Sequence, residues 1–173
     1  RDMAIIRQIT DQIEAVDGVK LLDVDPGAST NRTVVTFVGA PGPVIEAAYQ
    51  AIKKAGELID MRKQKGAHPR MGATDVCPLV PISGITAEET IPFAKALGAR
   101  VGEELDIPVY LYEDAATSPQ RKNLAVVRAG EYEGFAEKIL KPEWKPDFGD
   151  ARYNAFSGQT AIGVRGFLVA YNV

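Results

Sequence analysis

The chain has 173 residues, of which 46% are hydrophobic and 25% are charged, and its formal net charge at pH 7 is −3. These values are typical of one globular domain with a substantial core, and the negative charge argues against nucleic acid or an anionic membrane as partner. No apolar run approaches the roughly 18 residues of a membrane span, and the single cysteine, Cys77, excludes an internal disulfide and fits a reducing cytosol.

The first part of the chain is predicted to contain a helix and two strands. Apolar residues recur at helical spacing over residues 3–16, and Gly18 ends this pattern. Residues 19–24 and 33–38 have the composition of strands, and residues 25–31 between them are rich in turn formers.

The middle of the chain is predicted to contain two longer helices separated by an irregular strand. The first helix runs from Val44 to about Lys63, with Pro43 near its first turn. Residues 76–82 are apolar but contain two prolines, which favours an edge or irregular strand. Thr86 begins the capping-box pattern Thr-x-x-Glu, and a helix is predicted over residues 87–105.

The last part is predicted to be made of short elements. These are a strand over residues 108–112, one or two helices within 118–140 around Gly130, and one bent or two short strands over 160–173. Residues 146–158 form the longest polar loop, and long loops in compact domains are often functional.

Helices therefore alternate with single strands or hairpins, which indicates an α/β sandwich in which helices pack on one mixed β-sheet. A further strand before Arg1 would give the first half the ferredoxin-like order βαββαβ. The chain starts without Met and stops in the strand-like run 166–172, so we expect it to be a fragment of a longer protein.

His68 is the only histidine and lies in the glycine-bounded segment Lys65–Thr74. Histidine is the side chain that most readily accepts a proton near neutral pH. Pro69 favours an extended conformation at His68. The charges of Lys65 and Arg70 disfavour protonation of the ring, whereas a nearby helix C-terminus favours it. The segment is a candidate site for proton transfer.

The basic residues here also have a purely structural interpretation. Arg62, Lys63 and Lys65 follow the predicted helix and complement the negative end of its dipole. Gly66 is then available as a left-handed cap residue. The residues alone leave both interpretations open.

Two further segments carry polar side chains. The segment 23–32 offers Asp25, Ser29, Asn31 and Arg32 to orient an imidazole or to hold a carboxylate, unless these residues only form the turn. The segment 147–158 combines aromatic rings, an arginine and glycines, which suits a flat anionic ligand and equally an ordinary surface loop. The sequence has no phosphate-binding glycine motif and no zinc-ligand pattern, so no metal is expected.

Five segments together closely resemble the glutamate formiminotransferase family: Leu21–Thr33, Leu58–Pro78, Pro108–Tyr112, Arg128–Glu133 and Pro146–Gly149. The resemblance covers nearly the whole chain in order. It implies that residues 1–173 are the N-terminal subdomain of the formiminotransferase domain. The first strand of the family, its Pro-Asn-Phe-Ser-Glu-Gly segment and its C-terminal subdomain are absent from this chain.

The resemblance implies transfer of a formimino group from N-formimino-L-glutamate to tetrahydrofolate, a cytoplasmic step of histidine degradation and one-carbon metabolism. Tetrahydrofolate is then a co-substrate, no metal is required, and a homodimer is expected. The catalytic histidine of the family falls on His68, and Asp25 matches an acidic residue near its active site. The folate-contacting loop falls on Gly149, Asp150, Ala151, Arg152, Tyr153, Asn154, Ala155, Phe156, Ser157 and Gly158.

A chemical mechanism follows from this assignment. The N5 atom of tetrahydrofolate attacks the amidine carbon, and a neutral imidazole takes the N5 proton and passes it to the departing glutamate nitrogen. We assign this role to His68, with Asp25 fixing its tautomer, and expect Arg70, Arg32 and Lys65 to pair with the glutamate carboxylates. Two alternatives are a non-enzymatic folate-binding or interaction module of the same fold and a related enzyme that handles 5-formyltetrahydrofolate.

Overall fold

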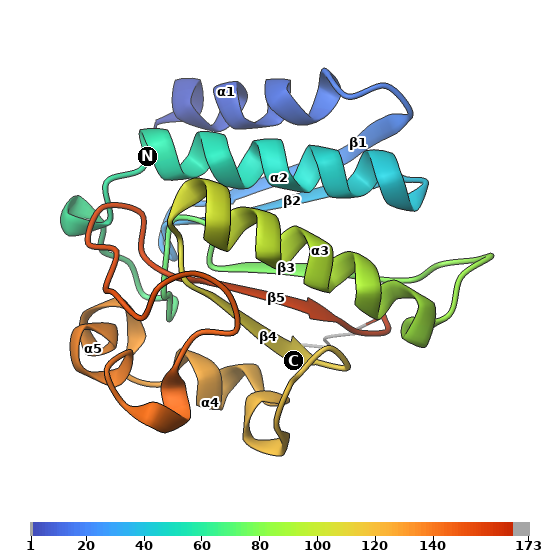
Figure 1. Cartoon of the computed structure of the whole chain (residues 1–173). Coiled ribbons are helices and arrows are strands. Elements are labelled where there is room, and N and C mark those ends of the chain that lie inside the picture. Colours follow the sequence, from blue (N-terminus) through green and yellow to red (C-terminus); the bar gives the residue numbers. More distant parts are fainter. Residues whose placement is uncertain (1, 168–173) are drawn as a thin grey trace, which may run out of the picture.

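The computed structural model describes residues 2–167 (Figure 1). The helices and strands in chain order are α1 Met3–Glu14, β1 Val19–Gly27, β2 Arg32–Gly39, α2 Pro41–Leu58, β3 Val76–Leu79, α3 Ala87–Leu105, β4 Val109–Glu113, α4 Leu124–Arg128, α5 Glu131–Lys138 and β5 Thr160–Val164. Short 3₁₀ turns cover Met61–Lys63, Pro119–Arg121 and Pro142–Trp144.

The helices form two layers around the strands, which confirms the α/β class. Figure 1 shows α1, α2 and α3 side by side on one face, while α4 and α5 lie on the opposite side of the strands. Alternate residues of β4 pack against the two helical layers. Val109 and Leu111 are buried against α2 and α3, and Tyr110 and Tyr112 are buried with Phe135 of α5. A strand that is apolar on both faces is typical of a sheet covered on both sides.

The strands divide between two sheets, whereas a single mixed sheet was predicted. β1 and β2 form an antiparallel pair, and β3, β5 and β4 form a parallel sheet in that order. Among the described residues, β2 and β3 each have a strand partner on one edge only. The two sheets are therefore separated between β2 and β3.

Most predicted elements are confirmed within a few residues. The helix at 87–105 has the predicted bounds, and Thr86 and Glu89 form both bonds of the capping box. Two short helices flank Gly130. Of the predicted strand 160–173, residues 160–164 form β5, and residues 168–173 lie outside the described part.

The predicted end of α2 is wrong. Ile59 has an extended backbone and ends the helix, and the Asp60 carboxylate accepts from the backbone N–H of Arg62 to begin a separate 3₁₀ turn. Aspartate competes with helical hydrogen bonds in this way. Gly66 is consequently not a left-handed helix cap, and Lys65 lies beyond the last turn of α2.

Candidate functional site

A large groove separates β2 from β3 and contains the only histidine. Its volume is about 1770 Å³, and the helices α1 and α2 contribute apolar side chains to its lining, among them Ile5, Ile9 and Ile52. His68, Arg32 and Lys65 line the groove as well. The imidazole is only partly buried, so a ligand in the groove has access to it.

Both ring nitrogens of His68 have a hydrogen-bond partner. Nδ1 lies 2.6 Å from the carbonyl oxygen of Pro69, and Nε2 lies 2.8 Å from Nη1 of Arg32. A carbonyl only accepts and a guanidinium only donates. The two contacts are therefore satisfied together when Nδ1 carries the hydrogen and Nε2 is the acceptor. The geometry favours a neutral imidazole whose basic nitrogen is Nε2.

Asp25 is not among the partners of the imidazole in the described structure. It lies on β1 opposite Val34 of β2, and its side chain is exposed. The Pro69 carbonyl takes the place at Nδ1 that the sequence assigned to Asp25. Arg32, from the same turn segment, contacts the ring instead at Nε2.

Arg70 was expected to bind a substrate carboxylate, but it pairs with two carboxylates of α5. Its guanidinium lies 2.7 Å from Glu133 and 3.4 Å from Glu131, and it also donates to the backbone carbonyl of Gln64. The bond from Arg70 lowers the pKa of Glu133, which keeps this carboxylate charged. Arg70 thus anchors the segment around His68 to α5.

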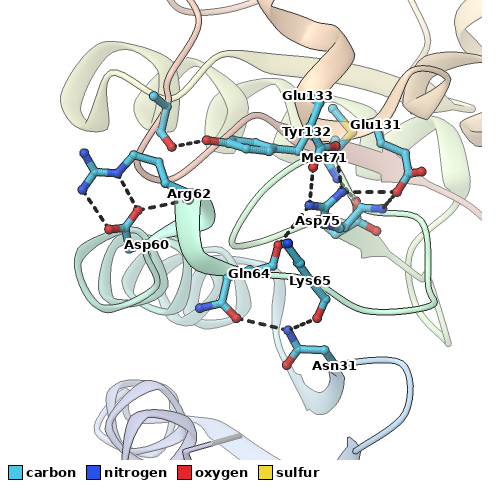
Figure 2. Close-up of polar contacts among 12 residues, drawn as sticks. Asn31, Asp60, Arg62, Gln64, Lys65, Met71, Asp75, Glu131, Tyr132 and Glu133 are labelled. Atoms are coloured by element: carbon cyan, nitrogen blue, oxygen red, sulfur yellow. Dashed lines mark hydrogen bonds and ion pairs between the residues drawn. The ribbon is translucent and has the colours of Figure 1, made fainter.

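The other side of the same segment is held by the β1–β2 turn. The Asn31 side-chain amide donates to the backbone carbonyl of Lys65 at 2.8 Å and to Oε1 of Gln64 at 3.1 Å. Figure 2 shows Asn31 on one side of the segment and Glu131 and Glu133 on the other. We call residues 64–74 the His68 turn.

Lys65 and Arg32 are the two expected cations that remain available at the site. The Lys65 side chain is exposed, and among the residues described it has no carboxylate within 4 Å. Arg32 is exposed and contacts the neutral imidazole rather than a carboxylate. Two cations beside a neutral base suit a substrate that carries carboxylates.

A third support of the His68 turn is a partly buried ion pair that the sequence did not indicate. Asp75 accepts from the backbone N–H of Met71 at 2.9 Å and pairs with Arg128 of α4 at 2.5 Å. Burial raises the pKa of Asp75, and the charge of Arg128 opposes that shift. Both residues line the groove.

The predicted folate loop, residues 149–158, packs against the His68 turn. Its last part is joined to the turn by a hydrogen bond from the backbone of Ala73 to Ser157 and by a bridge between Gly72 and Gly158. Its first part lies elsewhere, because Arg152 pairs with Asp106 at the end of α3. The structure therefore brings only the end of this loop beside the His68 turn.

Aromatic side chains cover the middle of that loop. The Tyr132 hydroxyl donates to the carbonyl of Ala155, and the Tyr132 and Tyr153 rings lie 5.4 Å apart. Phe156 is 39% exposed, and the Arg62 guanidinium lies 5.5 Å from the centre of its ring. An exposed ring beside a cation is suited to a flat anionic ligand.

The contact between the turn and the loop requires glycine. A Cβ atom at Gly72 would overlap the carbonyl oxygen of Gln159, and one at Gly158 would lie 2.5 Å from Cα of Gly72. Gly158 also has a φ of +72°, which disfavours other residues. The two backbones therefore approach more closely than side chains allow.

We expect Gly72→Ala to lower the free energy of unfolding by about 1–3 kcal/mol, because the added methyl group separates the turn from the loop. Urea unfolding measures the loss. The matched control is Gly134→Ala in α5, where a Cβ meets nothing within 4 Å. This control should be neutral or stabilising by up to about 1 kcal/mol. Equal stability of the two variants would contradict the close approach.

Residues 2–167 contain no helix that is long and apolar enough to cross a membrane. The same residues bring no three His, Cys, Asp or Glu side chains together as a metal site. Burial raises the pKa of Cys77 to about 12, so its thiol is protonated at neutral pH.

Sequence reasoning missed the partners that hold the site, namely Asp75, Glu131 and Glu133. Each pairs with an arginine that is 53 or more positions away in the chain. Two of these residues belong to the segment Arg128–Glu133, which contributed to the family resemblance. The dense charge of that segment was the available signal.

Comparison with known proteins shows which family this chain resembles. The model of the family described as "Formiminotransferase domain, N-terminal subdomain" matches residues 1–165. The formimidoyltransferase-cyclodeaminase of Dictyostelium discoideum is 51% identical over 173 residues, which are 100% of this chain and 32% of that protein. The glutamate formimidoyltransferase of Streptococcus pyogenes serotype M1 is 49% identical over 173 residues, 100% of this chain and 58% of that protein. The glutamate formimidoyltransferase of Thermoplasma acidophilum is 46% identical over 175 residues, which cover 100% of this chain and 57% of that protein. The chain thus spans between a third and three fifths of the length of these relatives.

Proposed function

The chain belongs to the formiminotransferase N-terminal subdomain family, and on this basis we propose that it carries the proton-transfer site of a glutamate formimidoyltransferase. The proposed reaction moves the formimino group of N-formimino-L-glutamate to tetrahydrofolate, as a cytosolic step of histidine degradation. The proposed unit is the N-terminal subdomain of a longer formiminotransferase domain.

The observation that carries the proposal is the pair of contacts that the ring nitrogens of His68 make with Pro69 and Arg32. The carbonyl of Pro69 holds the hydrogen on Nδ1, so the lone pair of Nε2 is directed away from the backbone. A general base must be neutral and must reach its proton within hydrogen-bond distance. The two contacts of the ring support the first condition for His68, and its place on the groove supports the second.

In the proposed transfer, Nε2 of His68 both takes up a proton and returns it. A bond forms between N5 of tetrahydrofolate and the amidine carbon, and Nε2 of His68 takes the N5 proton. The bond between that carbon and the glutamate nitrogen then breaks, and Nε2 returns the proton to the departing nitrogen. The products are 5-formiminotetrahydrofolate and glutamate, and the imidazole is regenerated.

Arg32 has a double role in this proposal. In the structure its guanidinium donates to Nε2 and covers this nitrogen. A substrate carboxylate is a better acceptor for a guanidinium than an imidazole is, because the bond is charge-assisted on both sides. We propose that Arg32 turns to a glutamate carboxylate when the substrate binds, with Lys65 beside it, and that this exposes Nε2.

The proposed folate surface is the end of the loop 149–158. Phe156 and Arg62 supply an exposed ring and a cation at a point where the loop is bonded to the His68 turn. The side chains of Asp150 and Arg152 are more than half exposed, and Arg152 is paired with Asp106. We therefore expect the folate contacts to be concentrated at residues 155–158.

A chimera tests the proposed function. The chain replaces the matching 173 residues of the Streptococcus pyogenes protein, and release of glutamate from N-formimino-L-glutamate is measured with and without tetrahydrofolate. We expect release that depends on tetrahydrofolate. Folate binding without release would favour the non-enzymatic module, and transfer from a formyl but not a formimino donor would favour the 5-formyltetrahydrofolate enzyme.

In the same chimera we expect Arg32→Gln to raise KM for N-formimino-L-glutamate by roughly 10-fold or more, since a charged hydrogen bond contributes about 1.5–3 kcal/mol. Asp25→Asn is the comparison, because the exposed Asp25 carboxylate has no bond to the imidazole. Steady-state kinetics should show less than about threefold change for this variant. A larger effect at Asp25 than at Arg32 would reverse the two proposed roles.

A further inference from the structure

Arg128 is the last residue of α4, and most of its hydrogen-bonding capacity is unused. Its side chain is 14% exposed, and Nη2 donates to the Asp75 carboxylate at 2.5 Å. Nε is buried and has no acceptor, and none is found for Nη1 among residues 2–167. Every nitrogen of a guanidinium is a donor, and buried donors in folded proteins almost always have a partner. Arg128 therefore has donors for a further acceptor.

Arg70 lines the groove as well, but its charge is more fully compensated. Its Nε atom also has no acceptor, yet its other two nitrogens donate to two carboxylates of α5 and to a backbone carbonyl. Its guanidinium also lies 5.7 Å from the centre of the Tyr132 ring. Arg128 has a single carboxylate partner, Asp75. Of the two arginines, Arg128 is thus the one with capacity for a ligand.

Arg128 and Arg32 reach the His68 turn from different sides. Asp75, the partner of Arg128, accepts from the backbone N–H of Met71, a residue of that turn. Burial raises the pKa of Asp75, and the charges of Arg128 and of a protonated His68 oppose this shift, which places the imidazole near the carboxylate. Arg32 begins β2, whereas α4 lies on the side of the strands opposite α1 and α2 (Figure 1). The groove around the imidazole thus has a guanidinium on each of two sides.

We propose that Arg128 binds one carboxylate of the ligand while Arg32 and Lys65 bind another, so that the groove selects a ligand with two carboxylates. This proposal rests on the proposed function, whose donor substrate, N-formimino-L-glutamate, has an α- and a γ-carboxylate. Bonds between guanidinium and carboxylate are charge-assisted, and the planar guanidinium favours bidentate contact. The glutamyl end of a folate has the same chemistry, so the test includes ligands of both kinds. Arg128 then has the role that was expected of Arg70.

A purely structural role of the pair Asp75–Arg128 leads to a different expectation. Asp75→Asn keeps the Oδ1 acceptor for Met71 and removes the charge that competes for Arg128. If Arg128 binds a carboxylate, this variant should bind the ligand more tightly, and Arg128→Gln should bind it more weakly. If the pair only braces the turn, both variants should weaken binding. The sign of the Asp75→Asn effect therefore separates the two roles.

The probe is N-formyl-L-glutamate, in which an oxygen replaces the imino group of the substrate, and calorimetry measures its dissociation constant for the chimera. We expect Arg128→Gln to raise this constant by roughly tenfold or more, and Arg128→Lys to raise it less because the charge is kept. Asp75→Asn should lower it by about threefold or more. The double variant Arg128→Gln with Asp75→Asn leaves no unpaired buried charge and should bind as weakly as Arg128→Gln.

The matched control is Arg165→Gln, the same change in another arginine that lines the groove. The backbone N–H of Arg165 donates to Leu79 at the end of β3, whereas Asp75 precedes the start of that strand. This distant substitution should alter the dissociation constant by less than about threefold. Circular dichroism and urea unfolding check that every variant is folded.

Further ligands identify which carboxylate Arg128 binds. N-formyl-L-glutamine lacks the γ-carboxylate, N-formyl-L-isoglutamine lacks the α-carboxylate, and 5-formyltetrahydropteroate lacks the glutamyl end of 5-formyltetrahydrofolate. The ligand without the bound carboxylate should have the same dissociation constant in the native chimera and in Arg128→Gln. A loss confined to the folate that carries a glutamyl end would assign Arg128 to the folate and would still support a carboxylate site.

The proposal is overturned if Arg128→Gln leaves the binding of every carboxylate ligand unchanged, or if Arg165→Gln weakens binding equally. It is also overturned if Asp75→Asn weakens binding or leaves it unchanged, or if the native chimera binds none of these ligands. The measurements involve no turnover and leave His68 intact. A chimera that binds through Arg128 but releases no glutamate would contradict the proposed function alone.

Discussion

His68→Gln is expected to lower kcat of the chimeric enzyme by about 10²–10⁴-fold, the usual contribution of a positioned general base. The glutamine amide oxygen can reach the position of Nε2 and accept from Arg32, so the contact with Arg32 is retained. The amide cannot take a proton near neutral pH. The loss should therefore appear in kcat and much less in KM.

The free energy of unfolding separates this chemical role from a structural one. In urea unfolding, the free energy of unfolding of His68→Gln should differ from that of the native chimera by less than about 1 kcal/mol. A variant that keeps turnover within tenfold of the native protein would refute the assignment.

Local interactions explain which parts of the fold could be predicted. The capping box at Thr86 and Glu89 uses residues three positions apart, and the helix that it starts has the predicted bounds. The turn around Gly130 was equally visible because glycine takes a φ of +88° there. Each of these signals is complete within a few residues of sequence.

The end of α2 was not predictable in the same way. Basic residues up to Lys65 continue a pattern that suits a helix end, yet Asp60 and a tertiary bond stop the helix earlier. The backbone N–H of Met61 donates to the carbonyl of Phe156 in the distant loop. Sequence pattern carries no information about such a partner.

In the candidate site, too, contacts between sequence neighbours could be predicted and contacts between distant residues could not. The sequence drew attention to the only histidine, which the structure places on the groove, and Pro69, its neighbour in sequence, supplies the partner of Nδ1. The partners of Arg70 lie on α5, more than 60 positions away. An arginine that seemed available to a substrate is therefore occupied by the protein itself.

The second large effect is expected at Asp147, the first residue of the Asp-Phe-Gly segment that leads into the loop 149–158. Its carboxylate pairs with Arg121 at 3.1 Å and accepts from the backbone of Leu111 and the hydroxyl of Thr117. The side chains of Asp147 and Arg121 are only 9% and 8% exposed. Removing one partner of such a pair leaves a charge buried without compensation.

We expect Asp147→Ala to lower the free energy of unfolding by about 3–5 kcal/mol, measured by urea unfolding. The loop should lose order with it, because the carbonyl of Phe148, the next residue, accepts from the backbone of Val109. Asp150→Ala, on an exposed side chain three residues later, should cost less than about 0.5 kcal/mol.

The double variant Asp147→Leu with Arg121→Met shows whether the unpaired Arg121 charge causes the loss of stability in Asp147→Ala. If the loss in Asp147→Ala comes from the unpaired Arg121 charge, the double variant should recover part of it, since apolar replacements of a buried pair are often neutral. Recovery cannot be complete, because the backbone N–H of Leu111 and the Thr117 hydroxyl lose their acceptor. A double variant less stable than Asp147→Ala would mean that Arg121 stabilises the loop by itself, through the carbonyls of Glu143 and Lys145.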